Sequence, residues 1–142
     1  MSRPIRSQLW LQIAVVYFVL AVALGLAMGA AGDFTLMPVH VQLNLLGWIA
    51  MSLIGLATAR FPQLGYGRLA VAQFWLYNLG VPVMLLALAA GIHGRTGAEH
   101  VATAASAIVA LSLGMLACQV GLCMRQSRLA HVRHGWHRAC GP

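Results

Sequence analysis

The chain has 142 residues, of which 61% are hydrophobic and only 8% are charged, and its mean hydropathy is +0.81. A water-soluble domain carries about a quarter charged residues, and a disordered chain has low hydrophobicity, so this composition excludes both classes. The net charge of +7 comes from nine basic and two acidic side chains. Because one membrane helix needs roughly 20 apolar residues, the length accommodates about four such helices and no soluble domain beside them.

Four apolar segments follow one another along the chain, and each is long enough to cross a bilayer. They cover about residues 9–31, 39–59, 69–92 and 101–124, and a basic tail covers residues 125–142. The connections between the segments are short, which favours antiparallel neighbours. We therefore expect a single all-α transmembrane domain, an up-down bundle of four helices.

The placement of arginine predicts the orientation of this bundle. Eight of the nine arginines fall on the side of the two termini, whereas Arg95 falls on the other side together with Asp33 and Glu99. The positive-inside rule then places both termini in the cytoplasm, in a membrane of the bacterial inner-membrane type. The same rule accounts for the positive charge, so we expect a lipid bilayer, and no nucleic acid, as the partner of this charge.

His40 is the most informative polar residue, because polar groups inside a bilayer are costly and are functional candidates by default. It lies near the outer end of the second span, and Asn44 follows one turn later on nearly the same face. Trp48 and Met51 continue that face, which predicts one wall of a binding site. The structural alternative is an interfacial histidine that hydrogen-bonds to a loop.

Five further histidines lie outside the second span. His93 and His100 flank the third connection, at a predicted depth similar to that of His40. Histidine is the commonest metal ligand, so these three imidazoles are a candidate metal site, with two surface loop histidines as the structural alternative. The tail carries His131, His134 and His137. A basic amphipathic segment that lies on anionic lipid explains the tail.

The stretch from His40 to Ile49 resembles the tenth helix of haem-copper oxidase subunit I, with the C-family bacterial oxidases and nitric oxide reductases as the closest variants. That helix has a His-x-His pair, a Leu-Gly-Trp sequence, a mid-helix glycine and a proline just after its end, and the next helix has a Phe-Trp pair and a glycine. The matching positions here are His40, Leu46-Gly47-Trp48, Gly55, Pro62, Phe74-Trp75 and Gly80. The resemblance covers about residues 39–84.

The resemblance implies a fold, a cofactor and an assembly. The oxidase subunit has twelve helices in three pseudo-equivalent arcs of four, so a four-helix relative has the size of one arc, and a homotrimer is implied. The first histidine of the family's pair, which matches His40, ligates the high-spin haem, and Gln42 replaces the second, which ligates the low-spin haem. The implied haem b site has His40 as axial ligand. Its other members would be Asn44, Trp48, Met51 and, at a propionate, Arg95.

Three functions stay open from the sequence. The first is a haem b-binding protein for electron transfer or diatomic gas binding, and a single histidine with an open sixth position favours gas binding. The second is a non-haem copper or zinc protein that binds through His40, including a threefold site built from three subunits. The third is a cofactor-free structural or assembly protein. The sequence contains no catalytic triad, phosphate loop or paired carboxylates, so we do not expect this chain to reduce oxygen alone, and whether it is an enzyme stays open.

Overall fold

The computed structural model describes the backbone of residues 7–139 and the side chains of residues 7–125, and all regular structure in this range is helical. The elements in chain order are α1 (Ser7–Ala31), α2 (Met37–Gln42), η1 (Leu43–Ala50), α3 (Met51–Arg60), η2 (Pro62–Gly65), α4 (Gly67–Ile92) and α5 (Ala98–Ala139). Four stretches of this range are long and apolar enough to cross a membrane: α1, the continuous α2–η1–α3 rod, α4 and residues 98–125 of α5. The predicted all-α fold with four transmembrane spans is therefore confirmed.

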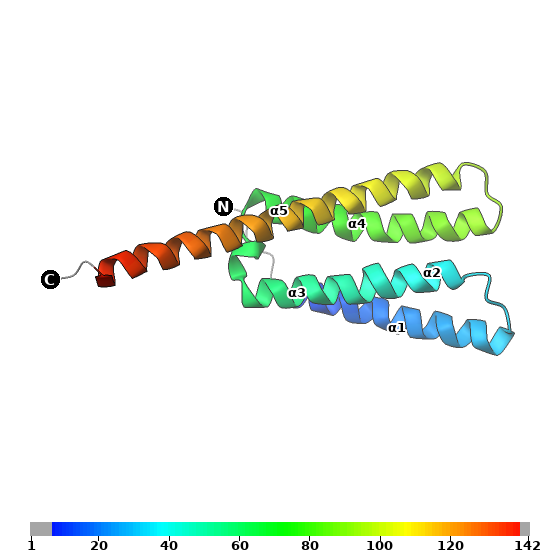
Figure 1. The fold of residues 1–142 in the computed structure, drawn as a ribbon. Helices are drawn as coiled ribbons and strands as arrows, with labels where there is room; N and C mark the ends of the chain where they lie inside the picture. Colours follow the sequence, from blue (N-terminus) through cyan, green and yellow to red (C-terminus); the bar gives the residue numbers. More distant parts are fainter. Residues whose placement is uncertain (1–6, 140–142) are drawn as a thin grey trace.

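Each predicted span lies inside an observed helix. The prediction did not include the continuation of the last helix into the tail. The backbone of α5 continues to Ala139, which gives this helix 42 residues. At 1.5 Å per residue it is about 63 Å long, roughly twice the thickness of a hydrocarbon core. Figure 1 shows α5 extending beyond the other helices. The predicted tail histidines, His131, His134 and His137, lie outside the described side chains.

The helices pack as an open row in chain order (Figure 1). α1 packs on η1 and α3, the α2–η1–α3 rod packs on α4, and α4 packs extensively on α5. Within the described residues, α1 and α5 have no extensive contact with each other. The expected up-down bundle is therefore not closed into a ring, and α1 and α5 form the two edges of the row within the described residues.

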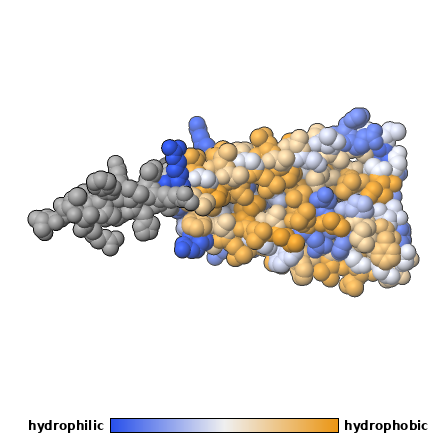
Figure 2. Space-filling model, in the orientation of Figure 1, coloured by the Kyte–Doolittle hydropathy of each residue, from blue (hydrophilic) through white to orange (hydrophobic). Residues whose placement is uncertain are grey.

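The row has two chemically different ends. At one end, α1 is followed by Gly32 with φ 65° and α4 by Gly94 with φ 75°, a left-handed conformation that glycine adopts without steric cost. We call this the acidic end, because both acidic side chains of the protein, Asp33 and Glu99, belong to it. The opposite end is called the basic end; it holds Arg60, Arg68 and Arg125. Figure 2 shows a mainly hydrophobic surface between hydrophilic ends.

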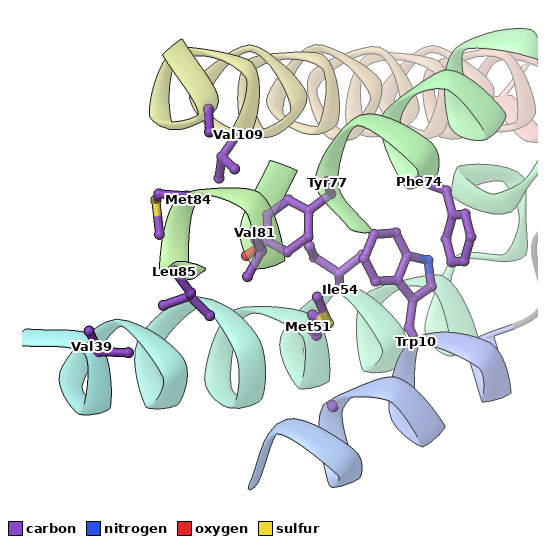
Figure 3. Close-up of a cluster of buried hydrophobic side chains, with 12 residues drawn as sticks. Trp10, Val39, Met51, Ile54, Phe74, Tyr77, Val81, Met84, Leu85 and Val109 are labelled. Atoms are coloured by element: carbon purple, nitrogen blue, oxygen red, sulfur yellow. The ribbon is translucent and has the colours of Figure 1, made fainter. Parts of the chain in front are cut away.

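Trp10 is the centre of the buried core, where three spans meet (Figure 3). Its side chain is 2% exposed and makes edge-to-face contacts with Phe74 and Tyr77, at ring centroid distances of 5.0 Å and 5.8 Å. Met51 and Ile54 of the second span complete this cluster. Edge-to-face aromatic pairs add about 0.5–1.5 kcal/mol beyond the burial of their area, so this cluster fixes how α1, α3 and α4 sit against one another.

The segment η1 is π-helical, which means that its backbone bonds run from residue i to i+5. The Tyr77 hydroxyl donates a hydrogen bond of 3.0 Å to the Leu46 carbonyl within this segment. Gly47 lies directly against Tyr17 of α1, and Trp48 packs its ring on Phe18 at a centroid distance of 4.8 Å. The part of the chain that carries the histidine motif is therefore locally unwound and held from both sides.

Most polar side chains in the α4 and α5 spans have structural roles. The Ser112 hydroxyl donates to the Gln73 carbonyl at 2.9 Å, which joins α5 to α4. The Asn78 amide donates to the Phe74 carbonyl at 2.9 Å, one turn earlier on its own helix. Since Pro82 has no N–H, the Asn78 carbonyl loses its ordinary helical donor. The Asn78 and Ser112 side chains thus satisfy backbone carbonyls, whereas the buried Nε2 of Gln73 has no hydrogen-bond partner among the described residues.

Candidate functional site

His40 is a half-buried side chain in α2, near the acidic end of the second span. Pro38 stands in the first turn of this short helix, where a missing N–H costs nothing. The backbone N–H of His40 donates to the Leu36 carbonyl at 3.0 Å, so the start of the helix fixes where the imidazole emerges. The predicted histidine therefore lies on a helix and not in a loop.

Asn44 contacts both the backbone and the ring of His40. Its Nδ2 atom lies 3.1 Å from the His40 carbonyl oxygen and 3.3 Å from Nε2 of the ring. A carbonyl oxygen only accepts hydrogen bonds, so the Asn44 side chain must face His40 with its NH2 group. One hydrogen of this group bonds to the carbonyl, and the second is available to Nε2. An Nε2 that accepts a hydrogen bond leaves the proton of neutral imidazole on Nδ1. The pairing of His40 with Asn44 predicted from helical spacing is thus present, and it selects the Nδ1–H tautomer.

The other ring nitrogen of His40 faces α1 and lacks a partner. Nδ1 is buried and has no hydrogen-bond partner among the described residues. The ring lies against Gly25, where a Cβ atom would come within 3.0 Å of Cε1 and 3.5 Å of Nδ1. A buried polar group without a partner costs roughly 1–3 kcal/mol, so the imidazole is the least satisfied polar group at this end of the row.

The remaining members of the predicted haem pocket do not gather around His40. Met51 is fully buried in the Trp10 cluster, and it lies eleven positions after His40 along the second span. Trp48 packs on α1. Arg95 is exposed in the loop between α4 and α5. The prediction of one continuous wall assumed a uniform α-helix, whereas the π-helical segment changes the angular register after Gln42.

The three-histidine metal site is not assembled. His93 and His100 are exposed at the ends of the α4–α5 connection. Across residues 7–125, no three His, Cys, Asp or Glu side chains come close enough to hold a metal ion. His40, His93 and His100 therefore do not come together in the described part of this chain, because a short loop keeps His93 and His100 at the surface, and a metal site that uses them stays a prediction.

Asp33, in the loop after α1, interacts electrostatically with His93, which follows α4. Hydrogen bonds from the hydroxyl and the backbone N–H of Thr35 hold the pKa of this carboxyl below its ordinary value of 3.8, and the charge of His93 lowers the pKa further. His93 thus acts on the loop that follows α1. This links the loop after α1 to the loop after α4.

Gly25 and Tyr77 belong to the site region although sequence reasoning gave them no such role. Gly25 is one of three small residues spaced by four in α1, with Ala21 and Gly29, and this spacing does not indicate that it faces His40. The bond of Tyr77 to Leu46 depends on the packing of α4 on η1. Both contacts join residues far apart in the sequence.

Comparison of the chain with protein-family models, with curated proteins and with solved structures found no match in any of the three.

Proposed function

We propose that this protein is an integral membrane protein that binds haem b through His40, for diatomic gas binding or electron transfer. The observation that carries the proposal is the incomplete bonding of the His40 imidazole inside a membrane span: Nδ1 has no partner within the described residues, and Nε2 has one long contact of 3.3 Å. Such groups in a bilayer are costly and are functional candidates by default.

A lone histidine favours haem over a bare metal ion. Zinc sites need three or four protein ligands, and the described residues bring no such group together. Haem iron needs only one proximal histidine, since the porphyrin supplies the other four nitrogens. A threefold copper or zinc site made by His40 of three subunits is disfavoured because the ring packs on Gly25 of its own chain.

The donor set fits a haem at one position. His40 would hold the iron through Nε2 after the Asn44 amide turns away, and the apolar surface of α1 and α2 would contact the porphyrin. Gln42 stands where a second histidine would be needed for a low-spin haem, so only one axial ligand is available. A haem with one histidine ligand supplies an open position for a diatomic gas and a one-electron couple.

An oxidised-minus-reduced absorption spectrum of the purified full-length protein, with haem and metal analysis of the same sample, tests the proposal. We expect a Soret band and haem that disappear in His40→Ala. His93→Ala and His100→Ala are matched controls because both side chains are exposed, and they should keep the haem. A protein that stays colourless after haemin addition, or a His40→Ala variant that retains haem, would contradict the assignment.

A second candidate is a cofactor-free structural or assembly protein, favoured by the contact between Asn44 Nδ2 and His40 Nε2. Asn44→Ala separates the two candidates. If His40 binds haem, removal of the amide frees Nε2, and haem content stays equal or rises. If the pair is structural, no variant carries haem, and Asn44→Ala lowers the stability by about 1 kcal/mol, the net value of one hydrogen bond.

The setting of this site is also a proposal. We infer that the open row corresponds to one arc of a haem-copper oxidase subunit I, that three copies assemble, and that the basic end is cytoplasmic in a bacterial-type inner membrane. The arginine bias supports the orientation. Mass measurement of the solubilised protein tests the trimer, and a reporter fused after residue 142 tests the side of the C-terminus.

A further inference from the structure

A small cavity at the basic end has features that the haem proposal does not use. It has a volume of about 190 Å³ and lies where η2 and the start of α4 meet α5. Its lining includes Gln63, Tyr66, Leu69, Gln119 and Leu122. The cavity is therefore at the level where the spans leave the bilayer, remote from His40.

Gln119 places an unused donor at this cavity. Its Nε2 is buried and has no hydrogen-bond partner among the described residues. The neighbouring amide of Gln63 is engaged, since its Nε2 lies 2.8 Å from the Cys123 sulfur. A buried amide that keeps a free N–H at a cavity favours a ligand that brings an acceptor oxygen, because the bond removes the cost of the unpaired group.

Two arginines lie close in sequence to residues that line the same cavity. Arg68 precedes the lining residue Leu69, and Arg125 follows Leu122 by three residues, on the same side of α5. Both arginines are exposed. The protein's two acidic side chains, Asp33 and Glu99, belong to the opposite end, so no side-chain carboxylate is available to pair with these guanidinium groups. Arginine binds phosphate through a planar fork of donors.

The apolar part of the lining indicates that the ligand also has an apolar part. Leu69 and Leu122 are exposed and line the cavity on the two helices that form it. An acyl chain would cover them, whereas a free anion would not. Basic pockets between transmembrane helices bind the head groups of anionic lipids.

We infer that this cavity is a binding site for the phosphate head group of an anionic phospholipid, with Gln119, Arg68 and Arg125 as its ligands. The inference is independent of the haem proposal, because it uses other residues at the other end of the row.

Native mass spectrometry of the full-length protein, titrated with phosphatidylglycerol or with phosphatidylcholine of the same chains, tests the inference. We expect tighter binding of phosphatidylglycerol and a loss of about fivefold in this preference for Arg68→Gln and for Arg125→Gln, the effect of one basic residue near an anionic head group. Gln119→Leu should lower the preference at constant charge. Gln119→Glu, which keeps the shape and replaces the donor by an acceptor, should abolish it, and serves if Gln119→Leu does not fold.

Arg95→Gln and Arg60→Gln are the matched controls, since each removes one positive charge at an exposed side chain outside the cavity lining. Equal loss of preference in these controls, with no effect of either Gln119 variant, would show diffuse electrostatic attraction and overturn the inference. Displacement of the lipid by an equal concentration of inorganic phosphate would identify a free-anion site and overturn it as well.

Discussion

Gly47→Ala tests the tightest contact at any glycine that the structure describes, the contact between η1 and α1. A Cβ atom on Gly47 would lie 2.5 Å from Tyr17 Cδ1, 2.6 Å from Cγ and 2.8 Å from Cβ. Carbon atoms pack best at about 3.5–4.0 Å, so the overlap approaches 1 Å. Since the contacts include the root of the Tyr17 side chain, rotation of the ring alone does not relieve them, and α1 has to move away from η1.

The expected cost follows from two opposing effects. Overpacking of a well-packed core costs about 1–3 kcal/mol, and alanine regains up to about 1 kcal/mol of helix propensity over glycine. A net loss of about 1–2 kcal/mol lowers Tm by roughly 2–8 °C in a chain of this size. Far-ultraviolet circular dichroism of the protein in detergent, followed during heating, measures the change.

Gly29→Ala is the matched control on the same pair of helices. No atom lies within 4 Å of a Cβ at this position, so the variant should melt at or slightly above the wild-type temperature. In a Tyr17→Ala background, Gly47→Ala should cost less than in the wild type, because two of the three contact atoms are absent. If Gly47→Ala melts as high as the wild type, the close contact between α1 and η1 is refuted.

Three further outcomes follow from the core and the loops. Tyr77→Phe removes the hydrogen bond to Leu46 and should destabilise the protein by about 0.5–1.5 kcal/mol; unchanged unfolding would argue that the bond contributes nothing. Trp10→Ala should cost about 3–5 kcal/mol, whereas Trp75→Ala, at a side chain that is 56% exposed, should cost far less; equal melting temperatures would refute the assignment of the core. Because folding lowers the pKa of Asp33, its ionised form adds stability at neutral pH that is lost as the pH falls through the folded pKa, below 3.8. The difference in Tm between wild type and Asp33→Asn should therefore shrink as the pH is lowered below 3.8, and a difference that does not depend on pH would contradict this reasoning.

The hydrophobic runs predicted the spans well, because an apolar stretch such as residues 69–92 can satisfy its backbone hydrogen bonds in a bilayer as a helix and in few other ways. The four predicted spans all fall inside observed helices. The π-helical segment was not predictable in this way, since Leu43–Ala50 contains no proline and its register depends on contacts from α1 and α4.

The candidate site was predictable only where it is local. The pairing of His40 with Asn44 follows from a spacing of four on one helix. The position of Met51 does not follow from such spacing, because the segment between His40 and Met51 is largely π-helical. The Met51 side chain packs in the Trp10 cluster instead. Gly25 against His40 is a contact between two helices, and one sequence without relatives does not indicate it.

The open row has a consequence for how the protein is made. Since α1 packs mainly on η1 and α3, and α4 packs mainly on α5, the hairpin of α1 with the second span can form while α4 and α5 are still being synthesised, and no late step has to bring the first helix to the last. Low contact order of this kind speeds folding. The turn at residues 61–66 then separates two hairpins that insert in succession, and a chain divided there should reassemble when both halves are expressed together.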